Sequence, residues 1–149
     1  MTSKQRETEF RAFIKSLGLK HFTAQEFINY SRRTRNGVKN SLPPKYLWRN
    51  IVPAIIIVDA LRAKFGKSCT LLSTYRSPAY NRAVGGAKRS QHLQFNALDI
   101  AFNGVTPSKV FNTLKSWRLE GVFDGGLGLY TSSGFVHIDT RGYKATWGK

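Results

Sequence analysis

Residues 90–100 read Ser-Gln-His-Leu-Gln-Phe-Asn-Ala-Leu-Asp-Ile. This stretch holds His92 and, seven residues later, Asp99, which lies inside an apolar run at residues 98–102 that is typical of a buried strand. A buried carboxylate is costly unless it meets a charge or a metal ion. The sequence therefore predicts that Asp99 has such a partner.

A second histidine stands in a similar setting downstream. Residues 134–139 read Gly-Phe-Val-His-Ile-Asp, so that His137 lies in a short apolar strand and Asp139 follows two residues later. Zinc accepts imidazole and carboxylate ligands, and three protein ligands leave its fourth position open for water. We therefore predict that His92, Asp99 and His137 bind one Zn²⁺. The alternative is that His92 is a surface residue and Asp99 caps the end of a strand.

Further motifs surround these residues. In chain order they are Thr74-Tyr75-Arg76-Ser77-Pro78, Asn81, Gly85-Gly86, Ser90-x-His92, Ala97-x-Asp99, Gly125-Gly126-x-Gly128-x-Tyr130 and Phe135-Val136-His137-x-Asp139. In this order, over roughly residues 22–147, the chain resembles the zinc D-Ala-D-Ala carboxypeptidase family. That family includes phage L-alanyl-D-glutamate endopeptidases and vancomycin-resistance dipeptidases, and it shares its fold with the hedgehog signalling domain.

The resemblance implies a zinc peptidase that cleaves stem peptides or cross-links of bacterial peptidoglycan. It implies that Arg76 lies beside the metal and contacts the scissile carbonyl or a carboxylate of the substrate. Ser90, Tyr75 and Tyr130 are expected to contact the substrate. The bond could be D-Ala-D-Ala, L-Ala-D-Glu or a cross-link through diaminopimelate.

The sequence departs from the family pattern at two positions. Many members carry Asp or Glu three residues before the second zinc histidine, where this chain has Gly134. We expect Asp139 either to replace this residue as the catalytic base or to orient His137 without binding the metal itself. Tyr130 and Asp124 are weaker alternatives for the base. Phe95 stands where the family usually has glycine.

The remaining pattern predicts an α+β domain spanning residues 1–149, with a small, mainly antiparallel sheet packed with helices. Helices are expected at 4–17, where an amphipathic pattern begins the chain, at 24–31, at 45–65 in two pieces around Pro53, and after Thr106 and Pro107. Strands are expected at 69–74, 98–102, 126–131 and 134–140. A basic loop is expected at 32–44.

Composition limits the partners and the compartment. The formal net charge is +16, which favours polyanionic partners such as the anionic polymers of a bacterial cell wall. The single Cys69 excludes an internal disulfide and stands in an apolar strand, where we expect a buried, inert thiol. No apolar run is long enough to span a membrane. The polar N-terminus lacks the apolar core of a signal peptide, so we expect synthesis in a host cytoplasm as a monomer, with action on the wall after release.

These features favour an enzyme of the phage-endolysin type. One alternative is a zinc-bearing module that binds the wall without catalysis, which Gly134 keeps open. The other is a basic nucleic-acid-binding protein, although the sequence has no recognised binding motif. An enzyme of the endolysin type requires no nucleic acid.

Overall fold

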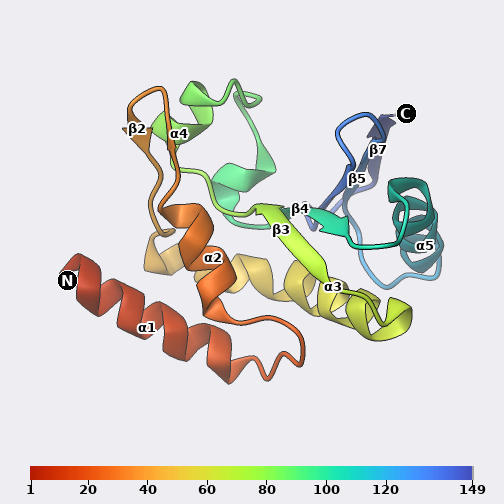
Figure 1. The fold of residues 1–149 in the computed structure, drawn as a ribbon, viewed down its shortest axis with the longest axis horizontal. Coiled ribbons are helices and arrows are strands. Elements are labelled where there is room, and N and C mark those ends of the chain that lie inside the picture. Colours follow the sequence, from red (N-terminus) through yellow and green to blue (C-terminus); the bar gives the residue numbers. More distant parts are fainter. Residues whose placement is uncertain (149) are drawn as a thin grey trace.

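The computed structural model describes residues 1–148 of the 149. Its elements are α-helices, 3₁₀ helices (η) and strands, shown in Figure 1: α1 (Ser3–Ser16), α2 (Ala24–Ser31), β1 (Thr34–Arg35), β2 (Val38–Lys39), η1 (Lys45–Ile51), α3 (Val52–Phe65), β3 (Cys69–Ser73), α4 (Pro78–Ala83), η2 (Gln91–Gln94), β4 (Ala97–Phe102), α5 (Pro107–Leu119), β5 (Gly126–Tyr130), β6 (Phe135–Asp139) and β7 (Ala145–Gly148). The predicted helices and strands are all present to within a few residues. Pro53 is the second residue of α3, so it marks the change from 3₁₀ to α-helix.

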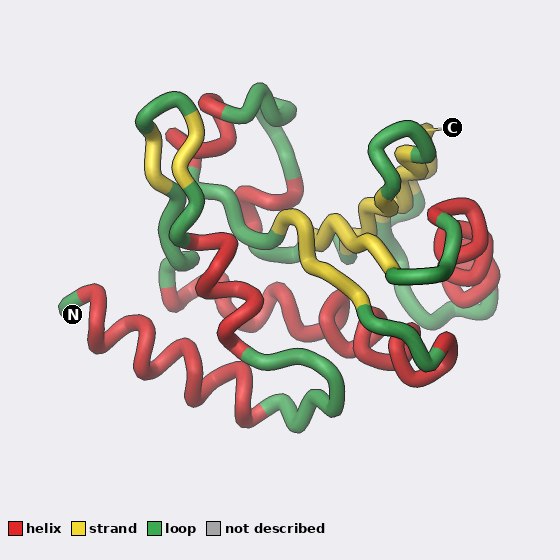
Figure 2. Tube along the Cα trace, in the orientation of Figure 1, coloured by secondary structure: helices red, strands yellow, loops and turns green. Residues whose placement is uncertain are grey.

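The main sheet has five strands in the order β3-β4-β6-β5-β7. The neighbours β3–β4, β4–β6 and β6–β5 are antiparallel, and the pair β5–β7 is parallel. Figure 2 shows this sheet running through the molecule, with a separate two-stranded hairpin at one end. The predicted α+β class with a mainly antiparallel sheet is confirmed.

The two faces of the sheet have different compositions because side chains alternate along each strand. Leu98 and Ile100 of β4, and Val136 and Ile138 of β6, belong to the hydrophobic core that α3 and α5 complete. The alternate positions on β4, β6 and β5 carry Ala97, Asp99, His137, Asp139 and Gly128. One face of the sheet is therefore used for stability, and the other is left for polar side chains.

Phe95 belongs to an aromatic core rather than to the polar face. Its side chain is fully buried, and its ring lies 6.1 Å from that of Phe10, 5.8 Å from Phe27 and 6.2 Å from Tyr75. Its backbone is left-handed, with φ of 55°. Glycine adopts this conformation without strain, which is a physical reason for the glycine that the resemblance leads us to expect here. The Phe95 side chain consequently does not alter the polar face.

Replacing Phe95 should separate packing from backbone strain. We expect Phe95→Ala to destabilise the protein by about 3–5 kcal/mol through the cavity it leaves. Phe95→Gly should be less destabilising than Phe95→Ala by about 1 kcal/mol, because only alanine still pays for the left-handed backbone. Urea unfolding of the two variants measures this difference. A glycine variant less stable than the alanine variant would contradict it.

Two segments contain structure that the sequence did not predict. The basic segment 32–44 includes the β1–β2 hairpin, where Thr34 pairs with Lys39. The C-terminal tail forms β7, which the buried Arg118 holds by donating hydrogen bonds to the carbonyl oxygens of Gly125 and Ala145. Both are too short to show a period-2 pattern.

The structure also bears on two smaller expectations, the state of Cys69 and the length of the helices. Cys69 is buried, and burial raises the pKa of its thiol to about 12, so it stays a thiol at neutral pH. Within residues 1–148, the helices are too short or too polar to cross a bilayer.

Candidate metal centre

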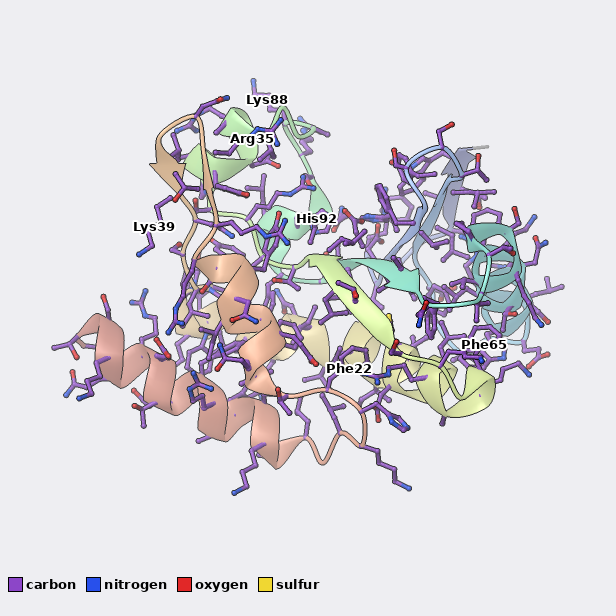
Figure 3. All side chains as sticks on the ribbon, in the orientation of Figure 1. Phe22, Arg35, Lys39, Phe65, Lys88 and His92 are labelled. Carbon is purple, nitrogen blue, oxygen red and sulfur yellow. The ribbon has the colours of Figure 1, made fainter. Side chains whose placement is uncertain are left out.

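Three separate elements bring His92, Asp99 and His137 together. Asp99 of β4 lies directly opposite His137 of β6 in the antiparallel register. His92 comes from η2, which packs against β4, and Figure 3 shows it near the centre of the molecule. One ligand atom from each residue lies within 4.8 Å of the others, and all three residues are buried. The predicted cluster is present.

The hydrogen bonds of His92 leave one ring nitrogen free. Its Nδ1 lies 2.7 Å from the carbonyl oxygen of Thr74, which can only accept, so Nδ1 carries the proton. Nε2 then has a lone pair, is buried without a hydrogen-bond partner, and lies 3.3 Å from Oδ2 of Asp99. A buried nitrogen of this kind aimed at a carboxylate suits a metal ligand, and so the residues present fit a divalent ion.

Asp139 lies behind His137 on β6 and is completely buried. Its Oδ2 is 2.7 Å from Nε2 of His137 and 2.7 Å from Nη2 of Arg141. Its Oδ1 accepts hydrogen bonds from the backbone N–H of Gly126 and from Nε of Arg141. Nδ1 of His137 is thereby turned toward Asp99, 2.9 Å from its Oδ1. Of the two roles expected for Asp139, this geometry suits the orientation of a ligand, because its oxygens have no room for a water molecule to be activated.

Asp139→Asn distinguishes the two roles. If Asp139 orients His137, the variant should bind zinc about 10–100-fold more weakly and recover most of its hydrolysis at saturating zinc. If it is the base, zinc affinity should be unchanged and kcat should fall about 10²–10⁴-fold even at saturating zinc. Titration with a competing chelator, together with rates at several zinc concentrations, separates these outcomes.

The charges in the cluster are strongly coupled. Burial alone would raise the pKa of Asp99, but the imidazoles of His92 and His137 hold it well below its usual range. Burial alone would also raise the pKa of Asp139, but the hydrogen bonds from His137 and Arg141 hold it below its usual range. Burial opposes protonation of His137, but its hydrogen bonds to Asp139 and Asp99 raise its pKa above the ordinary value. The metal-free cluster therefore favours a proton on His137 between two carboxylates.

Zinc must displace that proton, because a metal binds neutral imidazole. Since the pKa of His137 is raised, the proton is lost only at a higher pH than from an ordinary imidazole. We expect the apparent affinity for zinc to increase about tenfold per pH unit between pH 6 and 7, with about one proton released. Calorimetry in two buffers of different ionisation enthalpy measures the release. His21→Ala, whose imidazole lies outside the cluster, should release the same number; a pH-independent affinity would contradict the expectation.

Arg76 is held beside the cluster. Its Nη2 lies 3.7 Å from Oδ2 of Asp99, Nη1 donates to Oδ1 of Asn81, and Nε donates to the hydroxyl of Tyr30. The side chain is only 15% exposed, so a guanidinium at this position is directed by its partners rather than moving freely in solvent. The structure places Arg76 where the resemblance expects it, next to the proposed ligands.

An open pocket of about 440 Å³ lies over the three clustered residues, His92, Asp99 and His137. Residues 84–91 form one side of it, and Tyr130, Phe135 and Trp147 contribute to the other. These two parts of the chain lie on either side of β4 in Figure 1. A larger hollow of about 700 Å³ beside the first turns of α1 has no histidine or cysteine in its lining. The pocket over the cluster is therefore the candidate active site.

The expected substrate contacts divide into two groups. Ser90 and Tyr130 both line the pocket, and the Ser90 hydroxyl also accepts a hydrogen bond from the backbone N–H of His92. Tyr75 does not line it. Its ring is buried against Phe95 in the core, 6% exposed. The structure thus gives Tyr75 a packing role, because the residue before Arg76 points to the opposite side of the backbone.

Within the described residues 1–148, no carboxylate stands free in the pocket. Gly134 lies in the turn between β5 and β6 with φ of 79°, a left-handed conformation that glycine adopts most easily. Among residues 1–148, Asp99 is the one acidic side chain that lines the pocket, and Asp124 lies outside it. The base expected from relatives therefore has no direct substitute among the acidic residues.

Sequence reasoning missed two residues at the site, Arg141 and Trp147. Trp147 of β7 lies over Gly128, where a Cβ would come within 2.4 Å of its indole Nε1, and its ring is 5.2 Å from that of His137. Arg141 stacks on Trp147 at 5.3 Å and pairs with Asp139. The alternating glycines of β5 were the available indication, since they leave space for a large ring on this face.

Comparison with known sequences decides the family. A sequence model described as peptidase M15 matches residues 20–139, which include the three clustered residues, Arg76 and Asp139. The chain belongs to the peptidase M15 family. A search of solved structures found no significant match.

Two curated relatives are similar over part of this M15 chain. One is the peptidoglycan L,D-endopeptidase MepK of Escherichia coli K12, 38% identical over 79 residues, which is 50% of this chain and 41% of the relative. The other is the probable peptidoglycan L,D-endopeptidase MepK of Haemophilus influenzae, 37% identical over 78 residues, covering 49% and 39%. The match thus spans about two fifths of the length of these relatives.

Proposed function

We propose that this protein is a zinc-dependent peptidase that hydrolyses peptide bonds in bacterial peptidoglycan. The observation that carries the proposal is the cluster of His92, Asp99 and His137, which lies at the bottom of an open pocket in an M15 chain. The names of the two relatives, both peptidoglycan L,D-endopeptidases, support the choice of substrate.

Each residue of the site has a defined task in this proposal. Nε2 of His92, a carboxylate oxygen of Asp99 and Nδ1 of His137 would hold the zinc ion, and Asp139 orients His137. Bound there, zinc would polarise the scissile carbonyl and lower the pKa of water to about 7, so that a nucleophile forms without a strong separate base. Arg76 donates hydrogen bonds to the carbonyl oxygen as negative charge develops on it.

The charge of the pocket favours an acidic substrate. Arg76, Arg89 and Arg141 line it, while Asp99 is the one carboxylate in its lining among the residues that the structure describes. Arg89 is exposed and has no ion pair among the described residues. Stem peptides of peptidoglycan carry several free carboxylates, which such a pocket attracts. This supports cleavage within stem peptides or cross-links, the L,D bonds named for the relatives being the first to test.

A second cationic surface supports attachment to the wall. The β1–β2 hairpin packs against α4, and Asn36 donates a hydrogen bond to the carbonyl oxygen of Ala83. Arg35 and Lys39 of the hairpin and Lys88 of the loop after α4 lie on this side of the molecule in Figure 3. We propose that this surface contacts anionic wall polymers and that the protein acts as an endolysin of the phage type, made in a host cytoplasm and reaching the wall after release. High salt should weaken this attachment.

Digestion of purified peptidoglycan tests the proposed function. Zinc-loaded protein should convert cross-linked muropeptides into smaller products whose masses identify the cleaved bond, and a chelator should stop the reaction. Restored activity after zinc is added back would complete the test. Unchanged muropeptides with a fully zinc-loaded, folded protein would reject the peptidase and favour the non-catalytic wall-binding module, for which the pocket without a free carboxylate provides a specific reason.

A further inference from the structure

The hydroxyl of Tyr130 stands at the edge of the candidate active site. Tyr130 ends β5 directly opposite Phe135 of β6, and the two rings stack at 4.5 Å with an angle of 11° between them. The side chain lines the pocket and is 37% exposed, so a ligand can reach it. The stacked ring fixes the direction in which the hydroxyl points.

The hydrogen bond between Tyr130 and Trp147 has only one possible direction. Nε1 of Trp147 lies 2.8 Å from the Tyr130 hydroxyl oxygen, and an indole nitrogen can donate but cannot accept. The Tyr130 oxygen is therefore the acceptor in this contact. Its own proton is left for another acceptor, and the open side of the hydroxyl is the pocket.

The same contact places the hydroxyl close to the metal cluster. The Trp147 ring lies 5.2 Å from the His137 ring, and its Nε1 stands over Gly128, the residue directly opposite His137. Tyr130 is two residues from Gly128 on the same strand face. A substrate whose carbonyl reaches the cluster would thus pass beside the Tyr130 hydroxyl.

Amide hydrolysis needs a proton donor for the leaving nitrogen. Gly134 has no side chain, and the oxygens of Asp139 are occupied by His137, Arg141 and Gly126. The guanidinium groups that line the pocket do not release protons at neutral pH. Ser90, the other hydroxyl in the lining, is an aliphatic alcohol and a far weaker acid than a phenol. This leaves Tyr130 as the group suited to the task.

We propose that Tyr130 is the catalytic proton donor to the leaving amine. The inference rests on the proposed peptidase function and deepens it. Water forms a new C–O bond at the carbonyl carbon, the C–N bond breaks, and the Tyr130 proton passes to the nitrogen. The phenolate regains a proton from the attacking water, while the indole N–H of Trp147 stabilises the charged oxygen.

Two substrates with the same acyl part separate this role from others. One carries the natural amide, and the other carries an ester with a phenol leaving group, which departs without being protonated. For Tyr130→Phe we expect kcat on the amide to fall about 10²-fold or more, since general acid catalysis supplies about 10²–10⁴-fold. The ester rate and the zinc content should change little. Tyr46→Phe, which removes a hydroxyl from an exposed ring outside the pocket, is the matched control.

A second measurement uses the metal-free protein and needs no activity. In an NMR spectrum the indole N–H of Trp147, assigned by its loss in Trp147→Phe, should move upfield in Tyr130→Phe and stay in place in Tyr46→Phe. An unchanged indole signal would overturn the hydrogen bond on which the inference rests.

The kinetic outcomes separate the inference from the proposed function. Equal losses on amide and ester would place the Tyr130 hydroxyl on the carbonyl oxygen instead, and would overturn the proton-donor role. A Tyr130→Phe enzyme that cleaves the amide at the wild-type rate would reject the inference alone. A wild-type protein that cleaves no peptidoglycan peptide would reject the function, and the inference with it.

Discussion

Asp99→Asn is expected to lose zinc and to lower peptide hydrolysis by about 10³-fold or more. The amide keeps the size of the side chain but removes the charge that lies between the imidazoles of His92 and His137. A metal ion contributes several kcal/mol to stabilisation of the transition state, and each 1.36 kcal/mol corresponds to a factor of ten in rate. Metal analysis after dialysis and rates on a muropeptide measure the two effects.

Asp124→Asn is the matched control for this substitution. It makes the same chemical change at an exposed carboxylate outside the pocket, and it also removes the side chain that was the weaker alternative as a base. We expect its zinc content and its hydrolysis to equal those of the wild type. Circular dichroism should show that both variants are folded. If Asp99→Asn retained zinc and activity, the proposed ligand set would be wrong.

Arg76→Met is expected to lower kcat about 10²–10³-fold, the loss seen when one donor to a developing oxyanion is removed. Zinc content should stay unchanged, because Arg76 is not a ligand. The partially buried guanidinium is already oriented by Tyr30, Asn81 and Asp99, so it needs little reorganisation when charge develops. Rates over a range of substrate concentrations would show whether kcat or KM changes.

Two further variants test the geometry of Arg76. Arg82→Met removes an exposed cation from the neighbouring helix α4 and should leave kcat unchanged. Arg76→Lys keeps the charge but loses the planar fork, so it should recover only part of the activity. Full activity in Arg76→Lys would show that charge alone is needed, and an equal loss in Arg82→Met would show that net charge rather than position matters.

The ligand set and the fold class could be predicted because both leave local patterns. The apolar run around Asp99 and the strand around His137 each mark a polar side chain in a buried position, which is costly without a partner. Alternation along these strands also predicted that His137 and Asp139 share one face. The helices followed from apolar spacing and from start signals such as Thr106 with Pro107.

The details of the site depend on pairings between distant segments. Asp99 meets His137 only because β4 and β6 pair in one register, and a shift by one residue would turn one of them to the opposite face. Asp139 shares its strand face with His137 whether it acts as a base or orients a ligand. The hydrogen bonds from Arg141 and Gly126 favour the role of orienting His137. These hydrogen bonds could not be predicted from the spacing of residues in the sequence.

The sequence by itself predicted the cluster of His92, Asp99 and His137, and its resemblance to a zinc peptidase family predicted Arg76 beside them. Only the tertiary structure decided that Tyr75 packs in the core and that the tail returns as β7 to place Trp147 over Gly128. The physical reason is the range of the interactions involved. Strand alternation and helix capping act between residues a few positions apart, whereas strand pairing and ring packing join segments that only the folded chain brings together.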